Sequence, residues 1–181
     1  MDPFLGTRGA LARPLGLALL LLAACASAPA PKPSSAVPEI LKVPGDLPRL
    51  LRAAARGVQI YVCQPKANDP AAFEWALKAP EADLFDESGA KIGKHYAGPT
   101  WEHNDGSKVV GEVVQRSPSP TPGAILWLLL RAKANEGTGK FANVKYVQRL
   151  DTKGGVAPGG CDATAAGTET RVEYSANYDF Y

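Results

Sequence analysis

The strongest constraint on the fold of this chain is the regular alternation of apolar and polar side chains. In residues 171–181, five apolar residues at every second position alternate with polar neighbours. Residues 58–63 and 73–77 show the same period of two. This period places successive side chains on opposite sides of an extended strand, whereas a helix repeats every 3.6 residues. The alternation therefore predicts strands with one buried face.

Turn-forming residues separate the alternating runs. Residues 86–89 and 104–107 are short polar stretches that contain glycine, and an Asp-Gly pair between two such runs favours a hairpin. Residues 141–150 have strand character and lead into a glycine-rich loop at 153–160. The 18 glycines and 16 prolines favour turns over long helices. We predict a single all-β domain over residues 37–181, an antiparallel β-sandwich or barrel of about eight to ten short strands with little helix.

Two segments fit either a helix or a strand. Residues 47–56 have Asp46 as a candidate N-cap and Gly57 as a stop signal, and the pattern leaves both structures open. Residues 124–135 are rich in leucine, which favours a helix by propensity. However, residues 125–130 are apolar on both faces, which suits a central strand buried on both sides. We expect a strand in this second segment.

Residues 1–24 have the pattern of a lipoprotein signal peptide. Two arginines precede an apolar run at 14–24, whose eleven residues reach only about half of a ~30 Å hydrocarbon core as a helix and so do not form a permanent span. The run ends in Leu-Ala-Ala-Cys at Cys25, which resembles the lipobox of bacterial lipoproteins. The resemblance implies cleavage before Cys25 and lipidation of its thiol. The alternative is ordinary cleavage after Ala28 and plain secretion.

Residues 25–36 connect the anchor to the domain. They are rich in proline, alanine and serine and contain no large apolar residue, which is typical of an extended tether of about 3.1 Å per residue. More than one acyl chain on Cys25 makes a stable membrane anchor. Ala26 follows the cysteine, and resemblance to lipoprotein sorting then favours the outer membrane. We expect an exported outer-membrane lipoprotein that faces the periplasm or the surface.

Charge and motifs exclude several classes of protein. The chain has 20 Lys and Arg against 18 Asp and Glu, which gives no electrostatic case for nucleic acid. The basic residues are scattered, and we expect them on solvated faces. The chain lacks a Gly-x-Ser-x-Gly elbow, a Gly-x-Gly-x-x-Gly loop, a phosphate loop and a His-Glu-x-x-His motif. The sequence therefore predicts no cofactor and favours a non-enzymatic protein, although it leaves catalysis open.

Two cysteines remain if Cys25 carries lipid. They are Cys63 and Cys161, and the compartment beyond the membrane is oxidising, so we expect a disulfide between them. The alternative is a pair of buried free thiols.

Residues 93–107 are the segment richest in chemically active side chains, and they contain both histidines of the chain. We predict that this segment contacts a cell-wall glycan, a small molecule or a protein. The candidate ligand-binding residues are His95, Tyr96, Trp101, Glu102 and Asp105. One alternative is a metal-assisted hydrolase, because imidazole and carboxylate groups can hold a metal, with weak candidate ligands His95, Glu102 and Asp105. Another is a purely structural envelope component whose hairpin buries Trp101.

Aromatic residues also follow the strand period and could line a pocket, although such residues more often pack in a core or pair across strands. They are Trp75, Trp101, Trp127, Tyr146, Tyr174, Tyr178 and Tyr181.

Several motifs together resemble one family. They are Gly-Val-Gln-Ile-Tyr-x-Cys at 57–63, the run at 95–107, Trp-Leu-Leu-Leu at 127–130, Val-Gln-Arg at 147–149, Cys-Asp at 161–162 and the ending at 174–181. The combination is similar to the secreted family known as domain of unknown function 3455, and it extends from about Val37 to Tyr181. The resemblance implies an exported, mostly β domain without an established activity. It covers His95, Trp101, Glu102 and Asp105 but not His103, which weakens a metal site built on two histidines.

Overall fold

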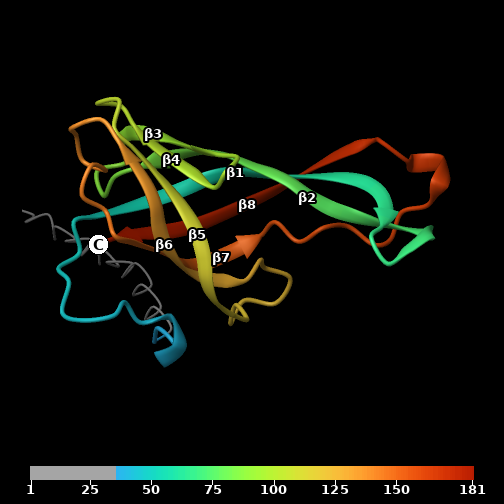
Figure 1. The fold of residues 1–181 in the computed structure, drawn as a ribbon, viewed down its shortest axis with the longest axis horizontal. Coiled ribbons are helices and arrows are strands. Elements are labelled where there is room, and N and C mark those ends of the chain that lie inside the picture. Colours follow the sequence, from blue (N-terminus) through green and yellow to red (C-terminus); the bar gives the residue numbers. More distant parts are fainter. Residues whose placement is uncertain (1–35) are drawn as a thin grey trace, which may run out of the picture. The chain divides into compact units, whose positions relative to one another are not determined.

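The computed structural model describes residues 36–181, which form one closed β-barrel (Figure 1). Within these residues, each strand pairs antiparallel with its neighbours in chain order, and the last strand pairs with the first. The strands are β1 (Leu51–Lys66), β2 (Asp69–Phe85), β3 (Lys91–Tyr96), β4 (Thr100–His103), β5 (Lys108–Ser117), β6 (Trp127–Glu136), β7 (Tyr146–Gly154) and β8 (Glu169–Phe180). The predicted single-domain, all-β, antiparallel fold is confirmed, and of the two architectures it is the barrel.

The first two strands are longer than the short strands that the alternation predicts. β1 has 16 residues and β2 has 17. The runs at 73–77 and 82–85 belong to one strand because a bulge absorbs the break in their alternation. Tyr61 pairs with Leu77 and Ile60 with Ala79, so Lys78 is the extra residue.

β1, β2 and β8 extend beyond the barrel as a three-stranded arm, seen at the right of Figure 1. The chain between β7 and β8 runs back along this arm and is held to β1. Cys63 and Cys161 form the predicted disulfide, with their Cα atoms 6.1 Å apart, so the alternative of two free thiols is wrong. The Tyr61 hydroxyl donates to the Gly155 carbonyl at 2.5 Å, and Cys63 and Thr168 are joined by a backbone hydrogen bond.

β6 is buried on both faces at its start, as its composition predicts. Leu128 and Leu130 face the barrel interior. Trp127 and Leu129 face outward and pack with Leu41 in a second core. This second core exists because the segment before β1, with a 3-10 turn η1 (Glu39–Leu41), lies over the outside of the barrel. The strand prediction for residues 124–135 is confirmed from Trp127 onward.

Two further predicted segments, residues 47–56 and residues 141–150, can also be compared with the structure. Residues 47–56 form no helix, and β1 begins at Leu51. The strand predicted from residue 141 begins only at Tyr146, so that part of the prediction is wrong. Residues 141–143 form a turn instead, because Phe141 is fully buried at one end of the barrel interior. Asn135 donates its side-chain amide to the carbonyls of Phe141 and Val144, which holds this turn in place.

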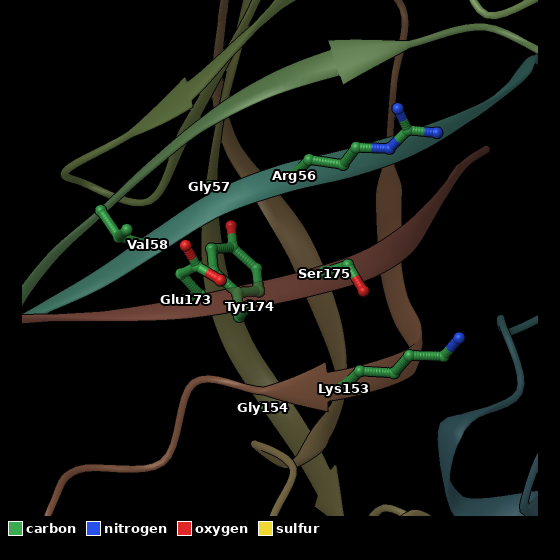
Figure 2. Close-up of a pocket in the computed structure, with 8 residues that line it drawn as sticks. All are labelled: Arg56, Gly57, Val58, Lys153, Gly154, Glu173, Tyr174 and Ser175. Atoms are coloured by element: carbon green, nitrogen blue, oxygen red, sulfur yellow. The ribbon is translucent and has the colours of Figure 1, made fainter.

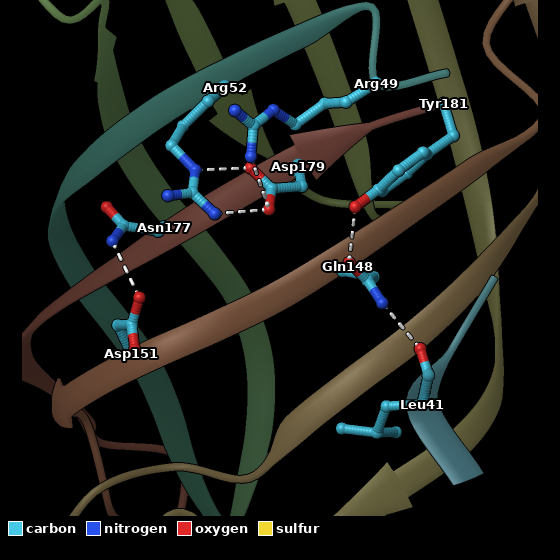
Figure 3. Close-up of polar contacts among 8 residues, drawn as sticks. All are labelled: Leu41, Arg49, Arg52, Gln148, Asp151, Asn177, Asp179 and Tyr181. Atoms are coloured by element: carbon cyan, nitrogen blue, oxygen red, sulfur yellow. Dashed lines mark hydrogen bonds and ion pairs between the residues drawn. The ribbon is translucent and has the colours of Figure 1, made fainter. Parts of the chain in front are cut away.

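Polar contacts reinforce the seam between β8 and β1 on the outer face (Figure 3). Arg52 in β1 binds Asp179 in β8 with two hydrogen bonds of 2.6 and 2.5 Å, and Asp179 is almost fully buried. Arg49 lies 3.6 Å from the same carboxylate.

The nearby Gln148 side chain donates to the Leu41 carbonyl at 2.6 Å and accepts from the Tyr181 hydroxyl at 2.9 Å. These bonds fasten both chain ends of the domain to the barrel wall.

The predicted signal peptide (residues 1–24), the lipidation site Cys25 and the tether up to residue 35 lie outside the described residues. The described residues 36–181 belong to one unit. Among the residues described, no helix has the length and hydrophobicity needed to cross a bilayer.

Reduction of the disulfide tests how much the arm depends on it. The double substitution Cys63→Ser with Cys161→Ser should lower the free energy of unfolding by about 2–4 kcal/mol, because it releases a closed loop in the unfolded chain. Urea unfolding of both proteins, with and without dithiothreitol, measures this. The reductant should destabilise the wild type and leave the double variant unchanged. Equal stability of the two proteins would contradict the structural role of the disulfide.

Candidate functional site

A cavity of about 340 Å³ lies inside the barrel. All eight strands contribute to its lining, which places it in the barrel interior and not between the outer side chains. Its floor contains His95, Trp101, Leu130 and Tyr178. Its rim contains the β3–β4 turn at residues 97–99.

A larger depression of about 640 Å³ lies on the outer face, where β8 runs between β1 and β7 (Figure 2). Arg56, Lys153 and Glu173 around it are all solvent-exposed, and each extends from a different strand. This depression lies open between surface side chains, and Tyr174 is the buried side chain in its lining. The interior cavity is therefore the stronger candidate site.

Stacked rings form the floor of the cavity. The His95 and Trp101 rings are parallel, with centroids 4.5 Å apart, and Tyr178 meets both rings edge-on at 5.1 and 5.3 Å. Gly111 on β5 makes room for the indole, because a Cβ at this position would lie 3.0 Å from Cζ3 of Trp101. The floor is therefore aromatic and well packed.

His95 is neutral in this setting. Burial lowers the pKa of His95 to about 3, and the positive charge of Arg149 acts in the same direction. The ring is 2% exposed, and its Nδ1–H donates to the Thr100 carbonyl at 2.8 Å. This bond leaves Nε2 without a proton, as an acceptor. A base with so low a pKa carries no charge at neutral pH.

Two side chains that line the cavity carry buried donors without a hydrogen-bond partner among the described residues. They are Nε2 of Gln59 and Nε1 of Trp101. The Tyr178 hydroxyl lies within hydrogen-bonding reach of Tyr174 and Arg149. Buried polar groups in folded proteins almost always have a partner. Unsatisfied donors gathered around one cavity point to an acceptor supplied from outside the chain.

Two arginines also face this cavity. Strand register places Arg116, Leu128, Arg149 and Tyr178 in one row across β5, β6, β7 and β8. Residues directly opposite each other on neighbouring strands share a face of the sheet. Leu128 and Tyr178 face inward, so Arg116 and Arg149 do as well. Arg149 donates from Nε to the Leu126 carbonyl at 3.0 Å.

The structure divides the five predicted site residues among three places. His95 and Trp101 line the cavity. Tyr96 and Glu102 lie on the outer face, where the Tyr96 hydroxyl donates to Glu102 at 2.8 Å. Partial burial and this bond raise the pKa of Tyr96 to about 12, while the bond and two nearby lysines lower the pKa of Glu102. Neighbouring residues on a strand point to opposite sides, which explains the separation.

Asp105 lies in the β4–β5 turn and has a structural role there. Its carboxylate accepts from the backbone N–H and the hydroxyl of Ser107, and from the backbone N–H of Lys140 at 2.8 Å. These bonds hold its pKa well below the usual range. His103 lies 3.0 Å from the same carboxylate. Asp105 thus joins two loops at the end of the barrel opposite the cavity rim.

The proposed metal ligands are not brought together. His95 lies inside the barrel, Glu102 outside it and Asp105 in a turn. Across residues 36–181, no group of three or more His, Cys, Asp or Glu side chains is arranged to hold a metal ion.

Gln59, Arg116 and Arg149 line the cavity but were not among the residues predicted from the sequence. Arg149 is half-buried, which differs from the expectation that the basic residues lie on solvated faces. Gln59 and Arg149 lie in the family motifs at 57–63 and 147–149, but nothing in those motifs marks them as cavity residues, and Arg116 lies in no motif. Only the pairing of distant strands places their side chains around one cavity.

The buried His95 makes stability depend on pH. Its folded pKa lies below its ordinary value of 6.5, so the unfolded chain binds a proton that the folded chain excludes, and stability falls as the pH drops below 6.5. Between pH 7 and pH 5 the wild type should lose about 2 kcal/mol more than His95→Gln. Urea unfolding at both pH values measures this. The loss should remain in the matched control His103→Gln, and identical losses in wild type and His95→Gln would contradict it.

Comparison with known proteins gives one match. The model of the family described as "Protein of unknown function (DUF3455)" matches residues 44–181. This confirms the resemblance seen in the sequence motifs. No curated protein and no solved structure matches the chain. The match covers the whole barrel, including every strand that lines the cavity, and the chain therefore belongs to the DUF3455 family.

Proposed function

We propose that this protein is an exported, lipid-anchored component of the cell envelope that binds a small molecule in the interior of its barrel. The carrying observation is the cavity of about 340 Å³, which all eight strands line and around which unpartnered buried donors gather. Ligand sites in proteins are typically concave, mostly apolar and a few hundred Å³ in volume, with a small number of polar groups. The cavity has these properties. Its size favours a small molecule over a glycan chain or a protein.

The chemistry of the cavity favours binding over catalysis. Acid–base catalysis works best with a group whose pKa lies near the operating pH. His95 is the histidine in the cavity lining, and its pKa of about 3 keeps it neutral. The lining contains no Asp or Glu side chain that could act with it. A cavity with stacked rings and unpaired donors suits recognition of a bound molecule.

The location rests on the sequence of the N-terminus together with the disulfide. A disulfide between Cys63 and Cys161 is typical of an oxidising compartment. The lipobox-like Leu-Ala-Ala-Cys at Cys25 supplies the anchor. An extended tether over the eleven residues 26–36 would span roughly 34 Å. We therefore propose that the tether holds the barrel within this distance of the outer membrane.

Lipidation is tested by the substitution Cys25→Ser. In a bacterial host that processes lipoproteins, the wild type should incorporate labelled palmitate and sediment with membranes. Cys25→Ser should lose the label and appear in the soluble fraction, because no thiol remains to accept the lipid. The matched control Cys63→Ser should keep the label. An unlabelled wild type, or label retained in Cys25→Ser, would refute the anchor.

Two fluorescent probes of similar shape test the cavity. They are N-phenyl-1-naphthylamine, which is neutral, and 8-anilinonaphthalene-1-sulfonate, which is an anion. At least one should bind the purified protein, and Leu128→Trp should weaken that binding at least about tenfold, because the larger side chain fills the cavity. The control Val114→Trp places the same side chain at an exposed position of β5 and should leave binding unchanged.

Energy transfer from tryptophan to the bound probe gives a second measurement that does not depend on a filled cavity. Trp101 lines the cavity, so Trp101→Phe should reduce the transfer more than Trp127→Phe does. Binding of neither probe, or equal binding to wild type and folded Leu128→Trp, would remove the binding function. The structural envelope component would then be the better explanation.

A further inference from the structure

We infer that the molecule bound in this cavity is a small organic anion whose acidic group lies between Arg116 and Arg149. This inference deepens the proposed binding function and rests on it. It is carried by the placement of the two arginines, by the charge balance of the lining and by the apolar floor beneath them.

The two arginines are placed to reach one group. Arg116 and Arg149 lie on either side of Leu128 in the same inward-facing row. Neighbouring strands are about 4.8 Å apart, so the two backbone positions are separated by roughly 10 Å across β6. An arginine side chain is long enough for two guanidinium groups to converge over that span. Leu128 lies between them and contributes apolar surface to the cavity.

The charge of the cavity is not balanced by the protein. The lining contains Lys78, Arg116 and Arg149 but no Asp or Glu. Lys78 is already engaged, because its ammonium group forms an ion pair with Glu169. Arg149 donates to the Leu126 carbonyl and also lies within hydrogen-bonding reach of the Tyr178 hydroxyl. Neither Arg149 nor Arg116 forms an ion pair with a carboxylate in the described part of the chain.

Three arginines on the outer face are paired with carboxylates, whereas Arg56 on the same face lies over the Phe85 ring. Arg52 pairs with Asp179, Arg131 with Glu112 and Arg171 with Glu81. Arg149 is half-buried beside the apolar lining of the cavity, and a partly desolvated guanidinium group gains most from a negative partner. Carboxylate and sulfonate groups can accept two parallel hydrogen bonds from arginine. An anion from outside the chain would give the cavity arginines the kind of negative partner that Arg52, Arg131 and Arg171 have within the chain.

The other lining residues indicate the chemistry of the part of the ligand that carries no charge. Trp101 and Leu130 lie below the arginine row, Tyr178 ends the row beside Arg149, and all three are buried. An apolar or aromatic body would cover these side chains. The Gln59 amide, which is 1% exposed and has an unpartnered Nε2 among the described residues, can donate to an additional acceptor on the ligand. The cavity therefore suits an amphipathic acid and not a bare inorganic ion.

The experiment compares the same two probes, the anion 8-anilinonaphthalene-1-sulfonate and the neutral N-phenyl-1-naphthylamine, on arginine variants. Arg116→Gln and Arg149→Gln should each weaken binding of the anion at least about tenfold and change binding of the neutral probe less than about twofold. The matched control Arg131→Gln removes an outer arginine and should affect neither probe. Arg116→Gln removes an exposed side chain, so loss of folding is not expected to obscure its result.

Competition distinguishes an organic acid from a bare anion. Addition of 1-naphthoate should displace the anionic probe at a concentration at least about tenfold below that of 1-naphthamide, which has the same ring and no charge. Inorganic sulfate at the same ionic strength should not displace it. Displacement by sulfate alone would overturn the inference of an organic body.

The outcomes separate this inference from the function on which it rests. If Leu128→Trp blocks a probe while both arginine variants bind the anion normally, the anion inference fails and the binding function stands. If the arginine variants weaken both probes equally, the charge is not recognised, and the inference fails as well. If Leu128→Trp leaves both probes bound, the cavity is not the site, and both proposals fail together.

Discussion

The pairing of the last strand with the first is the interaction on which the rest of the structure depends. β8 lies antiparallel to β1 over twelve residue pairs, and it is the only pairing that converts a row of hairpins into a closed barrel within the described chain. The Arg52–Asp179 ion pair spans this seam on the outer face, and the segment around Leu41 covers the adjacent wall. Closure removes exposed strand edges and creates an interior that eight strands share.

That interior has two different ends. At one end Phe141 stacks on Phe180 with ring centroids 4.5 Å apart, and the turns around Asp105 and Lys140 close over them. At the other end the row that contains Arg116 and Arg149 does not form a dry core, because Arg116 is exposed and Arg149 is only half-buried. The same barrel thus holds a core and a cavity.

The candidate site could be predicted only in part. The histidines, the tryptophan and the carboxylates of residues 93–107 are close in sequence, which led to one predicted site. The structure leaves His95 and Trp101 in the cavity and places Glu102 outside, because neighbouring positions on a strand face opposite ways. Arg116 and Arg149 could not be recognised as site residues, because only the register between distant strands brings their side chains to one cavity.

The sequence by itself determined that this chain forms strands, where several turns fall, that Cys63 and Cys161 pair and to which family the chain belongs. These properties depend on the local period, on turn residues and on residue type, which the chain carries without any long-range information. Only the tertiary structure decided between sandwich and barrel, placed the bulge at Lys78 and brought Gln59, Arg116 and Arg149 around one cavity. The physical reason is that a shift of one residue between distant strands turns every side chain to the other face.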